Sequence, residues 1–160
     1  MRYLLDTTAL IDFAKGREPA SSRILGFSEG GDELAVCAIN VAEFYAGVPP
    51  AQRGVWDEFF STLTYWDVTA QAARHAGCLR FDFARKGRVL STTDVIIAAV
   101  AQEKEAVIVT DNTKGLPDGR RASPVHFRLT TPGRCTTPPW SASSPGRPFS
   151  GARCASTSRR

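Results

Sequence analysis

Short, mostly apolar runs that alternate with segments of helical periodicity constrain the fold of this chain more than any other feature of its sequence. The runs lie at residues 2–6, 34–39, 65–68 and 106–110. A strand covered by helices on both faces has an unbroken apolar run, whereas a strand with one face in water alternates between apolar and polar residues. The sequence therefore predicts an α/β fold, in which a central parallel sheet is flanked by helices.

Helices are expected between these runs. They are predicted over residues 7–15, 19–28, 51–63, 69–86 and 92–104. In the longest of them, every third or fourth residue from Ala72 to Phe83 is apolar, which is typical of a helix packed on a core. A further short helix is expected to begin at Asn40, a good N-cap, and to end before Pro49.

The net positive charge of the chain comes from its last 46 residues. The formal net charge is +4, but residues 1–114 hold 12 Lys and Arg against 15 Asp and Glu, whereas residues 115–160 hold eight Arg and one acid. A basic surface is the usual footprint of a nucleic-acid-binding protein, and only the last segment offers one. No apolar run approaches the roughly 18 residues that a membrane span needs, and the N-terminus lacks the apolar core of a signal peptide. A cytoplasmic protein is therefore expected.

The same C-terminal segment differs in composition from the rest. It holds seven of the ten prolines, with many Ser, Thr, Gly and Arg. Residues 125–129 could form a short edge strand, but the remainder buries too little apolar area to offset the entropy of ordering. We expect one folded domain over residues 1–130 and a basic, irregular, disordered tail over residues 131–160.

Four acidic residues stand at the ends of predicted elements: Asp6, Glu43, Asp94 and Asp111. Ligands of parallel sheets bind at the carboxyl ends of the strands, where Asp6 and Asp111 fall. A carboxylate is costly to bury unless a positive charge meets it, so four of them suggest a cation between them. Mg²⁺ or Mn²⁺ prefers oxygen ligands and activates water against phosphodiesters, which indicates a metal-dependent nuclease.

Each acid also has a purely structural interpretation. Asp6 could cap the helix that follows it, and Asp111 could belong to an ordinary turn. Residues 40–43 and 91–94 both have the spacing of a capping box, in which Glu43 or Asp94 would reach back to the cap. These interpretations explain each residue singly, but not why all four fall where a parallel sheet can bring them together.

Four blocks of sequence together resemble the PIN domain, and more narrowly the VapC toxins of bacterial toxin–antitoxin pairs. The blocks are residues 4–12 (LLDTTALID), 40–43 (NVAE), 91–99 (STTDVIIAA) and 109–112 (VTDN). They occur in the family's order within residues 2–114. The resemblance marks residues 1–130 as a PIN-like nuclease domain.

The resemblance implies a magnesium-dependent endoribonuclease with these four acids around the metal. Asp6 and Asp94 would be the direct metal ligands, and Glu43 and Asp111 would complete the pocket or position water. It also places the first and fourth strands side by side. The implied partners are the RNA substrate and a small cognate antitoxin whose C-terminal segment covers the acidic pocket. A homodimer or a toxin–antitoxin hetero-oligomer is the implied assembly.

Other features leave alternatives open. The cluster Arg80, Arg85, Lys86 and Arg88 could contact RNA phosphates or form a solvated helix face, and the apolar residues Ile24, Leu25, Phe44 and Tyr45 could form the partner groove or the core. An aspartyl phosphatase would need an acid where Thr8 stands. A catalytically inactive module that only binds antitoxin or RNA is the second functional hypothesis.

The family pattern stops after Lys114, where the sequence turns abruptly rich in Arg, Pro and Ser. A shift of reading frame near codon 114 would produce such a change, and a genuine RNA-binding basic tail is the competing account. The four acids all precede this point.

Overall fold

The sheet at the centre of the molecule has four parallel strands. The computed structural model describes residues 1–111. Within them, the strands are β1 (Arg2–Leu5), β2 (Glu33–Cys37), β3 (Thr64–Trp66) and β4 (Val107–Val109), in the order β3-β2-β1-β4. Leu4 is paired with Ala35 of β2 and Leu5 with Val109 of β4. The predicted parallel sheet, with its first and fourth strands as neighbours, is confirmed.

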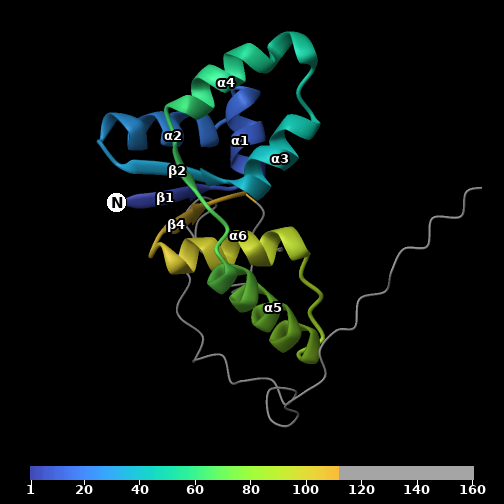
Figure 1. The fold of residues 1–160 in the computed structure, drawn as a ribbon. Coiled ribbons are helices and arrows are strands. Elements are labelled where there is room, and N and C mark those ends of the chain that lie inside the picture. The colour runs from blue at the N-terminus through green and yellow to red at the C-terminus, as the bar shows by residue number, and fades with distance from the viewer. Residues whose placement is uncertain (112–160) are drawn as a thin grey trace, which may run out of the picture.

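Helices cover both faces of this sheet (Figure 1). They are α1 (Thr7–Ala14), α2 (Ala20–Glu29), α3 (Ala38–Ala46), α4 (Arg53–Ser61), α5 (Ala70–Arg85) and α6 (Thr92–Glu103), with a short 3₁₀ helix at Pro50–Gln52. The helices α1 to α4 lie on one side of the sheet, and α5 and α6 lie on the other. All five long helices of the prediction are present, with ends that differ by at most two residues.

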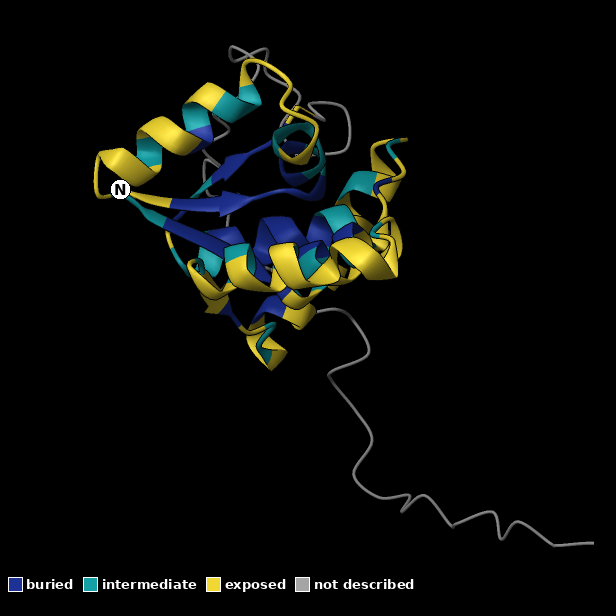
Figure 2. Ribbon diagram, turned by 90° about the horizontal axis from the view of Figure 1, so that it is seen from above, coloured by how far each residue is buried: buried dark blue, intermediate teal, exposed yellow. Residues whose placement is uncertain are grey.

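The strands point successive side chains into two separate cores, because the side chains of a strand alternate between the faces of its sheet. Leu4 packs with Ala98 and Ile108 in the core under α5 and α6. Its neighbour Leu5 packs with Leu10 of α1 in the core under α1 to α4. Both faces of the sheet are therefore buried, as Figure 2 shows, which explains why the strands lack polar alternation.

The start of α3 differs from the prediction. The second strand ends at Cys37 and the helix begins at Ala38, so Asn40 lies inside the first turn and is not the N-cap. Cys37 takes the N-cap position with an extended backbone, and its amide donates to Asn40 Oδ1 at 3.2 Å. A side chain at the third helical position that accepts from the cap amide is one half of a capping box. Asn40 fills the role that the spacing had suggested for Glu43.

The apolar residues considered for a partner groove divide between core and surface. Ile24 and Phe44 are buried in the core under α1 to α4, so the groove interpretation is wrong for both. Leu25 is 52% exposed, and Tyr45 is half-buried with its hydroxyl on Asp57. Within residues 1–111, none of the helices combines the length and the apolar character that crossing a membrane requires.

Candidate active site

Asp6 follows β1 directly and is held by two threonine hydroxyls. It occupies the N-cap position of α1, yet its side chain forms no capping hydrogen bond. Its Oδ2 instead accepts from Thr110 Oγ1 at 2.6 Å and from Thr8 Oγ1 at 3.0 Å. The residue is only 6% exposed. The capping interpretation is thus wrong for the side chain, which is oriented toward the junction of β1 and β4.

Glu43 lies in the second half of α3 and contacts the start of α1. Its Oε2 accepts a hydrogen bond from Thr7 Oγ1 at 2.6 Å. Because Asn40 already completes the capping box, Glu43 has no capping role. The Thr7 hydroxyl turns its carboxylate toward the N-terminus of α1, where Asp6 stands.

Asp94 lies in the first turn of α6, whose N-cap is Ser91. The Ser91 hydroxyl accepts from the Asp94 amide at 3.0 Å, so the predicted cap is confirmed. Burial raises the pKa of the Asp94 carboxyl, and the negative charges of Asp6 and Glu43 raise it further, while a hydrogen bond from the Ser91 side chain lowers it. The Asp94 carboxyl therefore lies within electrostatic range of both Asp6 and Glu43.

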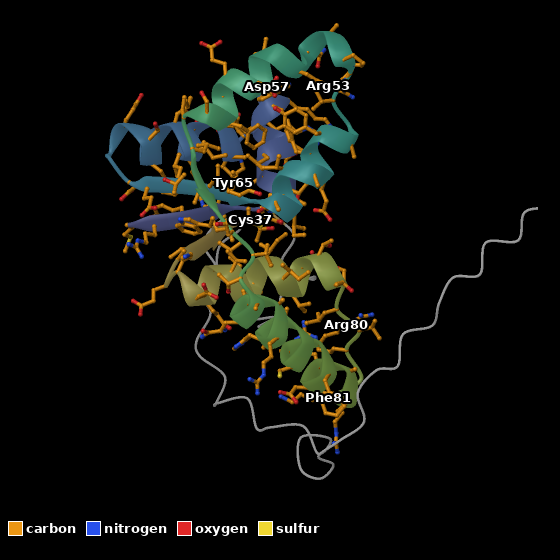
Figure 3. All side chains as sticks on the ribbon, in the orientation of Figure 1. Cys37, Arg53, Asp57, Tyr65, Arg80 and Phe81 are labelled. Atoms are coloured by element: carbon orange, nitrogen blue, oxygen red, sulfur yellow. The ribbon has the colours of Figure 1, made fainter. Side chains whose placement is uncertain are left out.

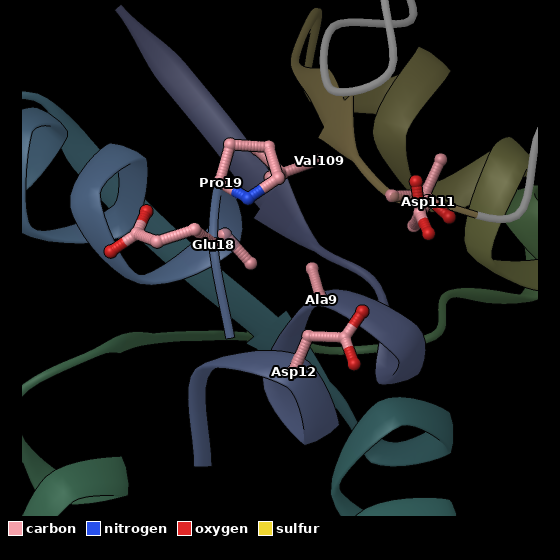
Figure 4. Close-up of a pocket in the computed structure, with 8 residues that line it drawn as sticks. Ala9, Asp12, Glu18, Pro19, Val109 and Asp111 are labelled. Carbon is pink, nitrogen blue, oxygen red and sulfur yellow. The ribbon is translucent and has the colours of Figure 1, made fainter. Parts of the chain in front are cut away.

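Asp111 reaches the same region through its backbone only. Its amide donates to Thr8 Oγ1 at 3.3 Å, next to the Asp6 cluster, but its side chain is exposed. That side chain lines a small neighbouring pocket of about 40 Å³ together with Asp12 and Glu18 (Figure 4). Asp12 forms an ion pair with Arg17 at 3.1 Å.

The three gathered carboxylates have no cation of their own. No ion pair within residues 1–111 involves Asp6, Glu43 or Asp94. Partial compensation comes from the N-termini of α1 and α6, where Asp6 and Asp94 sit, because the amino end of a helix carries a partial positive charge. The charges of Asp6 and Glu43, which raise the pKa of the Asp94 carboxyl, make this a place where a cation would be stabilised.

The thiol of Cys37 borders the acids on the side of β2. Burial raises its pKa, hydrogen bonds from the backbone near Asn40 and Ile39 lower it, and the charges of Asp6 and Glu43 raise it again. A fully buried thiol with a raised pKa is inert as a nucleophile. The chemistry of the cluster therefore comes from its carboxylates.

The described residues 1–111 contain no group of three His, Cys, Asp or Glu side chains arranged to hold a metal ion by themselves. Mg²⁺ does not need such a cage, because it keeps several of its waters and binds through one or two carboxylates. Two acids near each other, without a competing cation, fit that requirement. The donor set is also all oxygen, which hard cations prefer.

Sequence reasoning undervalued the threonines. Thr7 and Thr110 are a plain helix-start and strand-end residue by sequence, yet their hydroxyls hold Glu43 and Asp6. Thr8 was missed, although it donates to Asp6 and lies 3.0 Å from Thr110 Oγ1. The signal that could have found them is the pair Thr7-Thr8 after one strand and Thr110 after its neighbour.

Known proteins resemble this chain over most of its length. The PIN domain family model matches residues 3–118. Ribonuclease VapC2 of Haemophilus influenzae is 29% identical over 119 residues, which cover 71% of this chain and 89% of that protein. The tRNA(fMet)-specific endonuclease VapC of Shigella flexneri is 30% identical over 119 residues, with the same coverage of 71% and 89%.

Solved structures show the same arrangement of elements. VapBC2 from Rickettsia felis, bound to a DNA fragment from its promoter, matches with a TM-score of 0.63 and 25% identity over 71% of this chain and 90% of that one. DNA-bound VapBC from Salmonella typhimurium matches with a TM-score of 0.61 and 26% identity over 72% of this chain and 95% of that one.

Proposed function

Because this chain belongs to the PIN domain family, we propose that it is a Mg²⁺-dependent endoribonuclease and the toxin of a toxin–antitoxin pair. The observation that carries the proposal is the group of Asp6, Glu43 and Asp94, gathered at one edge of the sheet with no cation among residues 1–111 to neutralise it. Relatives of similar length are ribonucleases by name. These two observations together support an RNA substrate and a hydrolytic activity.

The proposed reaction is hydrolysis of a phosphodiester bond. The oxygen of a water molecule bonds to phosphorus, a P–O bond of the RNA backbone breaks, and the departing oxygen takes up a proton. Mg²⁺, when bound, would neutralise the phosphate charge and lower the pKa of the attacking water, and Mn²⁺ can supply the same chemistry. Asp6 and Asp94 are the residues proposed to hold the ion.

Glu43 is proposed to accept the proton of the attacking water. Thr7 engages its Oε2, and no hydrogen bond within residues 1–111 engages Oε1, which leaves that oxygen open to water. Thr8 and Thr110 keep the Asp6 carboxylate in one orientation, so that little reorganisation is needed when the ion binds. Asp111 is proposed to position water from the end of β4.

An RNA cleavage assay with purified protein tests this function. The wild type, Asp6→Asn and Asp94→Asn are compared in Mg²⁺ and in EDTA. Loss of a metal ligand removes several kcal/mol of transition-state stabilisation, so both substitutions are expected to slow cleavage roughly a hundredfold or more. Asp67→Asn, at an exposed acid remote from the cluster in sequence, is the matched control and should cleave normally.

Three outcomes would contradict the proposal. Cleavage that persists in EDTA would reject the metal, and cleavage that is insensitive to both substitutions would reject the site. A folded wild type that cleaves no RNA in Mg²⁺ or Mn²⁺ would favour the inactive binding module.

The proposed partner is a cognate antitoxin. The chain would bind it in a toxin–antitoxin hetero-oligomer, either as a single subunit or as a homodimer. The support is the likeness to VapBC complexes and to a toxin–antitoxin complex from Klebsiella pneumoniae. Co-expression with the protein encoded by the adjacent gene tests it. A stable complex that suppresses cleavage is expected, and active enzyme that elutes alone would reject the partner.

A further inference from the structure

The positive charge of the described residues is concentrated in one short segment. Residues 70–90 hold five Lys and Arg against the single acid Asp82, a net charge of +4. Residues 1–69 hold five against ten acids, and residues 91–111 hold one against four. An acidic body thus carries one basic region, made of α5 and the connection that leads to α6.

Four cations of this region form no ion pair with an acid of residues 1–111, whereas two arginines near the N-terminus do. Arg2 pairs with Glu33 at 3.0 Å and Arg17 with Asp12 at 3.1 Å. No ion pair within residues 1–111 engages any of four exposed cations, which are Arg74, Arg80, Arg85 and Lys86. Their charges are therefore available to an anionic partner.

An exposed aromatic ring lies among these cations. Phe81 is 58% exposed, and the Arg85 guanidinium lies over its ring at 5.7 Å from the centroid. Figure 3 shows Arg80 and Phe81 on the C-terminal half of α5. On the inner side of the helix, Lys86 and Arg88 lie over the half-buried Phe83 ring at 5.5 and 5.1 Å, which holds both cations near the helix end.

This region adjoins the acidic cluster through one short connection. Residues 86–91 join the end of α5 to Ser91, the N-cap of α6, and Asp94 follows in the first turn. Figure 1 shows that the C-terminal end of α5, the N-terminal end of α6 and the carboxyl ends of the strands lie on the same side of the molecule. A chain bound at the acids can therefore continue onto α5.

We propose that Arg74, Arg80, Phe81, Arg85 and Lys86 bind single-stranded RNA next to the cleavage site, with Phe81 stacking on an unpaired base and the cations contacting phosphates. The inference rests on the proposed ribonuclease function, which supplies the polyanion. Cations alone would suit any polyanion, but an exposed ring flanked by arginines suits a strand whose bases are free to stack. The basic–aromatic surface thereby offsets the repulsion between RNA and the acidic body.

Binding of an unstructured RNA of about ten nucleotides, measured by fluorescence anisotropy, tests the proposal. All proteins are full-length and carry Asp94→Asn, so that turnover does not interfere. Phe81→Leu is paired with Tyr65→Leu, because Tyr65 on β3 is equally open at 53% exposed. Arg80→Gln is paired with Arg53→Gln, at an exposed cation on α4. Any contribution of the basic residues 115–160 is the same in both members of each pair.

The expected result is a difference within each pair. Phe81→Leu should weaken binding about 5- to 150-fold, the range seen when one stacking ring is removed, while Tyr65→Leu should bind normally. Arg80→Gln should reduce the slope of log K against log salt by about 0.7, the value of one phosphate contact on a single strand. Arg53→Gln should leave that slope unchanged. When the same RNA is annealed to its complement, Phe81→Leu should bind this duplex almost as tightly as the protein that keeps Phe81.

Equal effects within both pairs would overturn the proposal in favour of general electrostatic attraction. Stronger binding to the duplex, or to vesicles rich in phosphatidylserine, with the same sensitivity to Arg80→Gln, would assign the surface to another partner. The ribonuclease function is tested separately, by cleavage with the protein that keeps Asp94. If that protein cleaves no RNA, the proposed function fails, and this result is distinct from the binding results. Circular dichroism confirms that the exposed substitutions leave the fold intact.

Discussion

The hydroxyl of Thr110 offers the sharpest test of how the acidic cluster is held together. Thr110 is 3% exposed and donates to the 6%-exposed Asp6 carboxylate at 2.6 Å, across 104 residues of sequence. Thr110→Val keeps the branched shape of the side chain and removes only the donor. The change therefore removes a hydrogen bond to a buried charge, together with the 3.0 Å contact between the hydroxyls of Thr110 and Thr8.

The magnitude follows from the surroundings of Asp6. A hydrogen bond to a charged group contributes about 1.5–3 kcal/mol. The Thr8 hydroxyl still donates to the same oxygen at 3.0 Å, so we expect a loss in the lower part of that range, about 1.5–2 kcal/mol. For a domain of this size, such a loss lowers the unfolding midpoint by roughly 5–12 °C.

The effect on catalysis should appear in the metal dependence. Removing a group that orients a metal-binding carboxylate costs about 10- to 100-fold in metal affinity or activity. Thr110→Val should therefore raise the Mg²⁺ concentration for half-maximal RNA cleavage by about that factor, with turnover recovering at saturating Mg²⁺. Thr110→Ser keeps the donor and should restore both stability and metal dependence. Thr64→Val, at an exposed position of β3, controls for the loss of a strand threonine.

Thermal unfolding and a Mg²⁺ titration of cleavage decide the outcome. The reasoning is refuted if Thr110→Val unfolds at the wild-type temperature and needs no more Mg²⁺ than the wild type. It is also refuted if Thr110→Ser is as impaired as Thr110→Val, because then the shape of the side chain matters and its hydroxyl does not.

Three further predictions concern other parts of the molecule. Because burial and the charges of Asp6 and Glu43 raise the pKa of Asp94, its contribution to stability is fully present below the unfolded value of 3.8 and is lost as pH rises through the raised folded value. Asp94→Asn should therefore raise the unfolding midpoint at neutral pH and not below pH 3.8; equal midpoints at neutral pH would contradict this. Thr7→Val removes the 2.6 Å bond to Glu43 and should lower kcat about tenfold without changing the Mg²⁺ dependence; an altered Mg²⁺ dependence would instead make Glu43 a ligand. Leu4→Ala, at a fully buried residue of β1, should cost about 2–5 kcal/mol in urea unfolding, and a smaller loss would mean that the core closes over the cavity.

The fold could be predicted because burial on two faces leaves a mark on the sequence. Runs such as residues 106–110 lack polar alternation since Ile108 and Val109 point into different cores. The end of β2 could not be predicted in the same way. The run continues to Ile39, and only the extended backbone at Cys37 and its hydrogen bond with Asn40 end the strand. The apolar periodicity of the sequence does not reveal whether residues 38 and 39 continue the strand or start the helix.

The sequence singles out the four acids of the candidate site, but not the side chains that orient them. The two spacings that resemble capping boxes behave differently, since Ser91 caps α6 as expected while Glu43 caps nothing. Which carboxylate is free depends on where each helix begins, to within two residues. The hydroxyl contacts of Asp6 depend on the pairing of β1 with β4, which brings together residues 104 positions apart. The catalytic roles of the four acids stay predictions.

The pairing of β1 with β4 also sets when the chain can become active during synthesis. A ribosome that has released residues only as far as Glu103 has already delivered Asp6, Glu43 and Asp94. The nascent chain still lacks β4 and the Thr110 hydroxyl that fixes Asp6. Since domains fold as units while they are synthesised, the carboxylates stay unassembled until nearly the whole domain has emerged.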